Sequence, residues 1–231
     1  MSAPALALTA RPMTDQLTLG LPEPATLPEI EALAPGAMVL RAFALSQAST
    51  ILADVERVVA AAPLRHLITP GGFRMSVAMT NCGALGWVSD ASGYRYSAVD
   101  PESGRPWPSL PDSFLGLATA AAERAGFGPL HPDACLVNRY APGARLTLHQ
   151  DKDELDLEAP IVSVSLGIPA VFLFGGLTRK ERPQRVPVQH GDVVVWGGPS
   201  RLRFHGVRAL EPASHPLTGG CRMNLTFRKT R

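Results

Sequence analysis

The stretch TLHQDKDE, from Thr147 to Glu154, places a histidine two residues before an aspartate inside an acidic run. On a β-strand, residues two apart point to the same side, so His149 and Asp151 could hold one metal ion while Gln150 faces away. A solvated, charged turn is the commoner origin of such a string. The metal interpretation therefore needs a third ligand from a distant segment.

Five histidines could supply that third ligand, namely His66, His131, His190, His205 and His215. His205 is favoured because it lies in the strand-like stretch RLRFHGVRAL, whereas His190 precedes GDVVVW at an expected turn. Two imidazoles and one carboxylate leave positions of an octahedral metal open, as in non-haem Fe(II) oxygenases that bind a cosubstrate and O₂. Zinc with a water in its fourth position would use the same three ligands in a hydrolase.

The stretch RMNLTFR carries a second polar set, in which polar and apolar residues alternate: Arg222, Asn224, Thr226 and Arg228. With the polar face outward, this would be an ordinary edge strand. With the polar face inward, two guanidiniums would need anionic partners, because unpaired buried charge is very costly. A dicarboxylate would satisfy both, since arginine grips a carboxylate through paired N–H donors.

These residues need a scaffold of short strands. After Asp133 the chain contains eight strand-like segments, separated by Gly and Pro turns: CLVNRY, RLTLH, IVSVSLG, AVFLFGG, RVPVQ, DVVVWGG, RFHGVRAL and RMNLTFR. Such a series, without helices between its members, favours an antiparallel sandwich or barrel over a parallel α/β sheet. We therefore expect a mainly β (α+β) fold with a double-stranded β-helix, or jelly roll, over residues 133–229.

Two supporting helices are expected ahead of this core. Residues 46–63 have apolar side chains at helical spacing, with Ser46 or Ser49 as the cap, and a second helix fits residues 111–126. Between them, residues 69–108 are rich in glycine and aromatic residues, in short stretches typical of hairpins. Residues 1–35 are rich in Pro, Ala and Leu, so we expect a flexible leader followed by one domain over residues 36–231.

Composition sets further limits. A chain of 231 residues with 45% hydrophobic content can bury a substantial core, and its net charge of +2 is too small to predict a polyanionic partner from charge alone. Three widely spaced cysteines argue against a disulfide framework or a zinc ribbon. No apolar run approaches the ~18–20 residues that span a bilayer. We expect a soluble, cytoplasmic, monomeric protein.

Four motifs then follow one another along the chain. Asn138 and Tyr140 share one strand face in VNRY, although a core tyrosine with a satisfied hydroxyl would give the same pattern. The order NxY, HxD, a distant His205 and RxNxTxR (residues 222–228) resembles the Fe(II)- and 2-oxoglutarate-dependent AlkB dioxygenases. The resemblance covers roughly residues 35–229 and extends to strings such as TPGGFRMSVAMTNCGALGW and NRYAPGARLTLHQDKDE.

The resemblance implies that His149, Asp151 and His205 bind Fe(II), with 2-oxoglutarate and O₂ as cosubstrates. It also implies a set of side chains that holds 2-oxoglutarate: Tyr140, Arg222 and Asn224 at its far carboxylate, and Asn138 and Arg228 at its iron-proximal end.

By the same resemblance, residues 69–108 form a nucleotide-recognition lid. Trp87 would stack on a flipped base, with His149 as the opposite wall, and Asp153 would accept a hydrogen bond from the exocyclic amine of that base. The remaining substrate contacts implied are Tyr94, Arg95 and Tyr96 on the phosphate backbone, and Arg179.

The implied reaction is oxidative demethylation of N1-methyladenine and N3-methylcytosine in single-stranded DNA, with double-stranded DNA and RNA as further candidate substrates. It would release formaldehyde, succinate and CO₂. Two alternatives stand beside it at this stage: a module that binds lesions without turnover, and a zinc hydrolase on the same three ligands.

Overall fold

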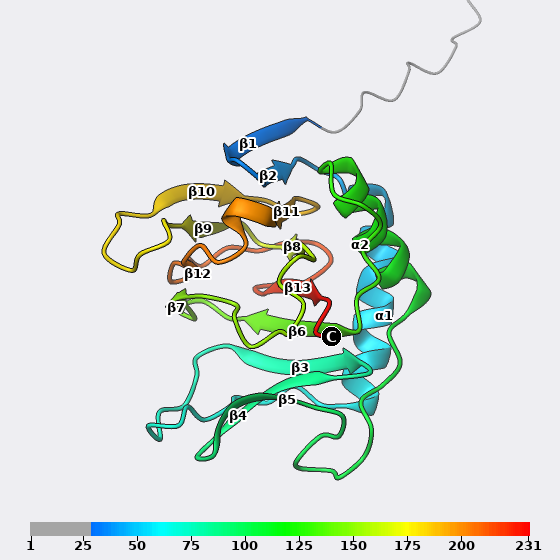
Figure 1. Cartoon of the computed structure of the whole chain (residues 1–231). Coiled ribbons are helices and arrows are strands. Elements are labelled where there is room, and N and C mark those ends of the chain that lie inside the picture. Colours follow the sequence, from blue (N-terminus) through cyan, green and yellow to red (C-terminus); the bar gives the residue numbers. More distant parts are fainter. Residues whose placement is uncertain (1–28) are drawn as a thin grey trace, which may run out of the picture.

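Two antiparallel β-sheets form the centre of the computed structural model, which describes residues 29–231 (Figure 1). The strands of the larger sheet are β1 (Ile30–Ala34), β2 (Ala37–Leu40), β3 (Ala78–Gly83), β6 (Ala134–Tyr140), β8 (Ile161–Gly167), β11 (Val193–Trp196) and β13 (Arg222–Arg228). They lie in the order β1-β2-β11-β8-β13-β6-β3. Strand β13 pairs with β8 on one edge and with β6 on the other, and the side chains on both of its faces are buried.

The smaller sheet consists of β7 (Leu146–His149), β9 (Ala170–Phe174), β10 (Gln184–Val188) and β12 (His205–Val207), in the order β10-β9-β12-β7. All eight strands expected after Asp133 are present, and they divide equally between the two sheets. The expected jelly-roll core is confirmed.

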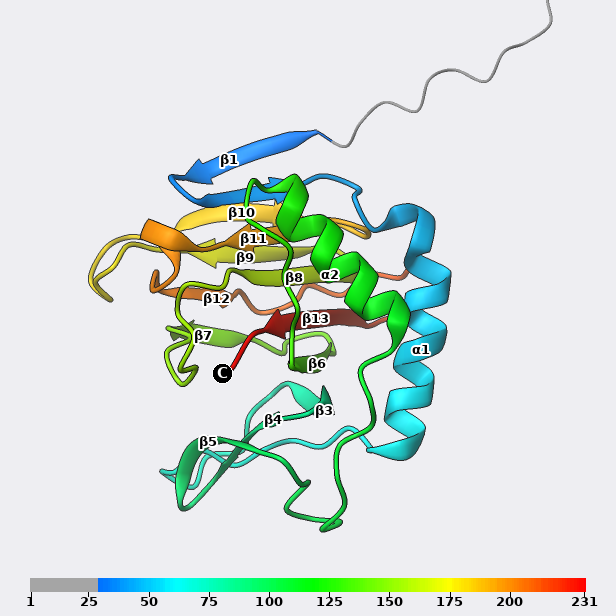
Figure 2. The same cartoon turned by 45° about the vertical axis from the view of Figure 1, so that its right-hand side comes forward.

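Helices α1 (Ala48–Ala61) and α2 (Asp112–Arg124) cover one face of the larger sheet, on the right in Figure 1, and Figure 2 shows α2 crossing its strands. Ile51 and Leu117 of these helices pack in one cluster with Leu225 and Phe227 of β13. Both expected helices are confirmed. The expected serine caps of α1 are wrong. A short 3₁₀ turn, η1 (Leu45–Gln47), precedes the helix, and the N-cap residue of α1 is Gln47, whose side chain makes no capping hydrogen bond.

The opposite face of the larger sheet meets the smaller sheet, and this interior carries the polar side chains of the alternating strands. The polar residues of β13 are all buried there, on the side away from the helices: Arg222, Asn224, Thr226 and Arg228. The inward-facing arrangement of RMNLTFR is therefore the one that the chain adopts.

Two expected boundaries differ from the structure. β3 belongs to the larger sheet, where it pairs with β6, so only β4 (Gly86–Asp90) and β5 (Gly93–Ser97) form a separate hairpin within residues 69–108. β1 pairs with β2, so residues 30–34 belong to the folded unit rather than to a leader. The rest of the expected leader, residues 1–28, lies outside the described residues. Within residues 29–231, no helix has the length and apolar character needed to cross a membrane.

Candidate metal centre

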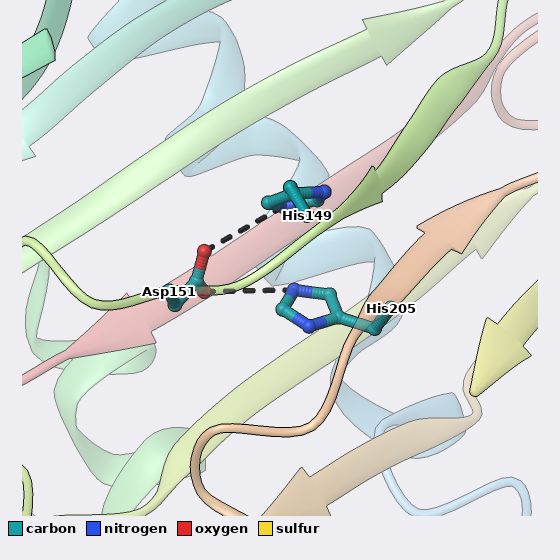
Figure 3. A group of neighbouring side chains, drawn as sticks. All are labelled: His149, Asp151 and His205. Carbon is teal, nitrogen blue, oxygen red and sulfur yellow. Dashed lines mark ion pairs between the residues drawn. The ribbon is translucent and has the colours of Figure 1, made fainter. Parts of the chain in front are cut away.

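Three residues from three segments converge between the sheets. His149 ends β7, and the strand register places it directly opposite His205 at the start of β12. Asp151 follows two residues after His149. Its two carboxylate oxygens lie 3.5 Å from His149 Nε2 and 3.7 Å from His205 Nε2 (Figure 3). One ligand atom from each of the three residues lies within 4.8 Å of the others, so the three predicted metal ligands do come together.

Both imidazoles are held in the tautomer that metal binding requires. Nδ1 of His149 lies 2.9 Å from the Thr147 carbonyl, and Nδ1 of His205 lies 3.1 Å from the Arg203 carbonyl. Since a carbonyl only accepts, each Nδ1 carries a hydrogen, so the neutral form of each ring has its lone pair on Nε2. Burial lowers the pKa of His205 to about 3, helped by the neighbouring His149, so His205 is neutral at physiological pH.

Asp151 is held in its charged form. Burial alone would raise the pKa of its carboxyl group, but the Arg228 guanidinium, which donates two hydrogen bonds to it, holds that pKa below its usual range. Two neutral imidazoles and one carboxylate are the protonation states in which these groups ligate a metal ion. The donor set therefore fits Fe(II).

Arg222 is a buried cation that lacks an anionic partner among the described residues. Its Nη2 donates to Ser165 Oγ at 2.8 Å and its Cζ lies 4.9 Å from the centre of the Tyr140 ring, while Nε and Nη1 have no hydrogen-bond partner within residues 29–231. Burial lowers the pKa of this guanidinium. Because an uncompensated buried charge is very costly, the site calls for a bound anion, and a carboxylate matches the guanidinium in shape.

The two predicted asparagines lie beside Arg222. Asn138 Nδ2 donates to Asn224 Oδ1 at 3.2 Å, and the Asn138 Oδ1 atom has no partner in the described part of the chain. Asn224 donates in turn to Ser163 Oγ at 2.8 Å. The sequence prediction missed Ser163 and Ser165, although their alternation in IVSVSLG puts both on one face of β8, the same sheet face that carries the polar residues of β13.

Arg228 lies beside the metal ligands and lines the cavity. Its Nε and Nη2 donate to Asp151 Oδ2 at 2.9 and 2.6 Å, and its Nε also lies 3.3 Å from Glu154 Oε1. The guanidinium thus holds the carboxylate of a metal ligand, and its expected contact with 2-oxoglutarate stays a prediction.

A cavity of about 940 Å³ opens from the three ligands toward the β4–β5 hairpin. Trp87 lines it, with its indole N–H donating to Asp153 Oδ2 at 3.1 Å and its ring stacked on that of Tyr94 at 5.4 Å between centroids. Arg179 also lines the cavity, with its Cζ 5.8 Å from the centre of the Phe204 ring.

Two of the residues expected on the phosphate backbone are engaged elsewhere. Arg95 donates to both carboxylate oxygens of Asp90, at 3.0 and 2.7 Å, within its own hairpin. The Tyr96 hydroxyl points inward and donates to Glu154 Oε1 at 2.5 Å. Tyr94 is about half exposed and, like Tyr96, lines the cavity.

A family model described as "2OG-Fe(II) oxygenase superfamily" matches residues 36–228. The chain belongs to this superfamily. The oxygenase is 59% identical over 199 residues to "Alpha-ketoglutarate-dependent dioxygenase AlkB" of Salmonella typhimurium (strain LT2), an alignment that covers 86% of this chain and 92% of that protein. The AlkB of Escherichia coli (strain K12) is 57% identical with the same coverage. The solved structure of OsALKBH1 superposes with a TM-score of 0.79 and 30% identity, covering 87% of this chain and 100% of that one.

The oxygenase is therefore an Fe(II)- and 2-oxoglutarate-dependent dioxygenase of AlkB type, which uses O₂. The zinc-hydrolase and pure-binding alternatives no longer apply. Bound iron supplies the activation of O₂, with 2-oxoglutarate as the source of two electrons. The chain itself supplies the three metal ligands and a buried guanidinium, that of Arg222, which has no anionic partner among the described residues.

Proposed function

We propose that this dioxygenase removes methyl groups oxidatively from the pairing edge of nucleobases, with N1-methyladenine and N3-methylcytosine in DNA as substrates and RNA as a further one. The observation that carries the proposal is the cavity above the metal ligands, where the Trp87 ring and the Asp153 carboxylate that it bonds lie side by side. A relative that is 34% identical over 140 residues, from Schizosaccharomyces pombe, is named "tRNA demethylase abh1". We place the activity in a monomeric, cytoplasmic enzyme.

The shape and charge of the cavity suit a flipped, alkylated base. Trp87 forms one wall and the half-buried His149 ring the other, so a planar base can be held between them. Asp153 is exposed at this point and can accept a hydrogen bond from an exocyclic amine. Methylation at N1 of adenine or N3 of cytosine makes the base cationic, which favours a pocket that contains a carboxylate.

The reaction balances with the cosubstrates already named. One oxygen atom of O₂ enters succinate as 2-oxoglutarate loses CO₂, and the other enters the C–H bond of the methyl group. The resulting N-hydroxymethyl group loses formaldehyde, which returns the nitrogen to its unmodified state. The side chains of the cavity bind and orient the base so that its methyl group faces the metal ligands.

The rim of the cavity carries charge for a polyanion. Four exposed cations line it: Arg74, Arg145, Lys152 and Arg179. Phosphate contacts of this kind contribute affinity without reading sequence, and they weaken as salt rises.

The direct test supplies protein, Fe(II), 2-oxoglutarate and a methylated oligonucleotide without air, then admits O₂ and measures formaldehyde. We expect release from N1-methyladenine and N3-methylcytosine in single-stranded DNA, with matched duplex and RNA oligonucleotides giving the preference. Asp153→Asn should lower kcat/KM for these bases by about tenfold or more, the value of one hydrogen bond to a charged group. Glu158→Gln, an exposed acid of the same segment outside the cavity, is the matched control. Absence of formaldehyde from fully metallated protein would refute the proposed substrates.

A further inference from the structure

Glu154, the last residue of TLHQDKDE, is a buried carboxylate to which the reaction proposed above assigns no part. Its Oε1 accepts from the Tyr96 hydroxyl at 2.5 Å and lies 3.3 Å from Arg228 Nε. Its Oε2 accepts from Arg201 Nη2 at 3.2 Å. One carboxylate thus touches the β4–β5 hairpin, the central strand β13 and the turn before β12.

Arg201 bonds to both ends and to the middle of the segment that contains Glu154, residues 151–159. Its Nη1 donates to the Asp151 carbonyl at 2.7 Å and its Nε donates to the Ala159 carbonyl at 3.0 Å, in addition to the bond to Glu154. Residues 151–159 form neither helix nor strand, so no ladder of backbone hydrogen bonds holds them in place. The guanidinium of Arg201, itself 3% exposed, performs that task.

Two routes therefore join Glu154 to the metal ligand Asp151. The first runs through Arg228, which bridges Glu154 Oε1 and Asp151 Oδ2. The second runs through Arg201, which bridges Glu154 Oε2 and the Asp151 main chain. Two buried guanidiniums face two buried carboxylates, so removing one negative charge leaves excess positive charge next to a cation site.

The third contact reaches the lid. Tyr96 belongs to β5, and its hydroxyl is buried against Glu154. Burial and the nearby Glu154 carboxylate raise the pKa of this phenol, so it stays a hydrogen-bond donor at physiological pH. Movement of the hairpin that carries Trp87 would pull on the carboxylate that orients both arginines.

We propose that Glu154 is a positioning residue that couples the nucleotide-recognition hairpin to the iron site. It acts through Arg228 and Arg201 on Asp151, and through Tyr96 on the hairpin. The proposal has two halves. Its iron half, the action of Glu154 on Asp151, rests on the donor set and the family alone, whereas its hairpin half, the action through Tyr96, rests on the proposed function.

The iron half is tested by metal binding without turnover, as the affinity of the anaerobic protein for Mn(II) or Co(II). Glu154→Gln should weaken that affinity about ten- to hundredfold, the usual effect of losing a residue that orients metal ligands. Asp192→Asn is the matched control, because Asp192 is also a buried carboxylate paired with an arginine, Arg41, but lies outside the cavity. Both variants should lose stability, and only Glu154→Gln should lose metal. Equal metal affinity of the two folded variants would overturn this half.

The hairpin half is tested with Tyr96→Phe, which keeps Glu154 and both arginines and so also serves if Glu154→Gln fails to fold. Metal affinity should stay at the parental value. The ratio of succinate formed to formaldehyde released should rise above the parental ratio. In this variant O₂ would be consumed even when no base is bound in the cavity. A parental ratio in this variant would overturn the coupling. If the parent itself releases no formaldehyde, the proposed function fails, and the metal titration still decides the iron half.

Discussion

Each histidine of the metal centre is oriented by a hydrogen bond from its ring to the nearby main chain. Both donate from Nδ1 to the carbonyl two residues earlier, of Thr147 and Arg203. The HxD spacing predicted two ligands on one side of a strand, and the register between β7 and β12 supplies the third. The carbonyl partners of the histidines could not be predicted, because they depend on side-chain rotamers. The bond from Arg228 to Asp151 could not be predicted either, because it joins residues 77 positions apart.

The ligands differ in what they contribute to stability. His149 is a third exposed, so His149→Ala should abolish iron-dependent turnover and change the free energy of unfolding by less than ~1 kcal/mol. Asp151→Asn should also abolish turnover, but it leaves Arg228 buried with a weaker partner and should cost roughly 1–3 kcal/mol. Urea unfolding of the metal-free proteins measures the difference. Equal stability of the two variants would show that the Asp151–Arg228 pair contributes nothing to the fold.

Arg222 differs from these ligands, because we expect its buried guanidinium to lower the stability of the metal-free fold. Arg222→Met keeps the volume of the side chain but removes the guanidinium that burial penalises. The metal-free variant should be as stable as the parent or more stable, by about 1–3 kcal/mol, since replacing an uncompensated buried charge by an apolar side chain relieves its desolvation. Its affinity for 2-oxoglutarate should fall by at least about a hundredfold. Calorimetric titration and urea unfolding of the same samples check both parts.

At the scale of elements, alternation of polar and apolar residues was enough to predict the eight strands after Asp133. The four strands in the larger sheet have one face toward the helices and one toward the interior between the sheets, and the four strands of the smaller sheet turn one face toward that interior. β1 was missed because Ile30–Ala34 follows a proline-rich stretch and has weak strand propensity. Its pairing with β2 through a turn at Gly36, with φ of 72°, overrides that propensity. β3 was assigned to the lid because nothing local signals its pairing with β6, more than fifty residues later.

A pair of histidines joins two connecting segments of the jelly roll. His190, in the turn between β10 and β11, accepts a hydrogen bond from the Gly167 backbone N–H at 2.9 Å, and its ring lies 4.2 Å from that of His215 in the loop before β13. Burial and His215 lower the pKa of His190. In the unfolded chain His190 takes up a proton near pH 6.5, but in the fold it resists protonation, so the contribution of this pair to stability falls as the pH drops below about 6.5.

The His190→Asn variant keeps a hydrogen-bond acceptor but does not titrate. Its loss of stability between pH 8 and pH 5.5 should therefore be smaller than that of the parent. Urea unfolding of both proteins at the two pH values isolates the contribution of His190, since His205 is common to both. An identical pH dependence would mean that the histidine pair carries no linked proton.

At the scale of the whole molecule, the larger sheet separates two interiors, and the one between the sheets combines a hydrophobic cluster with buried charged side chains. On one side, its apolar residues pack against α1 and α2. On the other side, its polar residues face the smaller sheet and carry charges that the described chain does not fully neutralise. The second interior therefore joins apolar packing that supports the fold to polar groups whose hydrogen bonds a bound ligand would complete. Ligands should therefore stabilise the molecule as a whole rather than locally.

That expectation can be quantified. A ligand present at a hundred times its Kd stabilises the folded state by about 2.7 kcal/mol, which for a domain of this size raises Tm by roughly 5–10 °C. Mn(II), as a redox-inert substitute, and 2-oxoglutarate should each raise Tm, and 2-oxoglutarate should raise it more when Mn(II) is present, because both occupy one cavity. Arg222→Met should keep the Mn(II) shift and lose most of the 2-oxoglutarate shift. Were the 2-oxoglutarate shift to survive in that variant, the unpaired guanidinium would not be the anchor of the cosubstrate, and Arg228 or Asn138 would have to take its place.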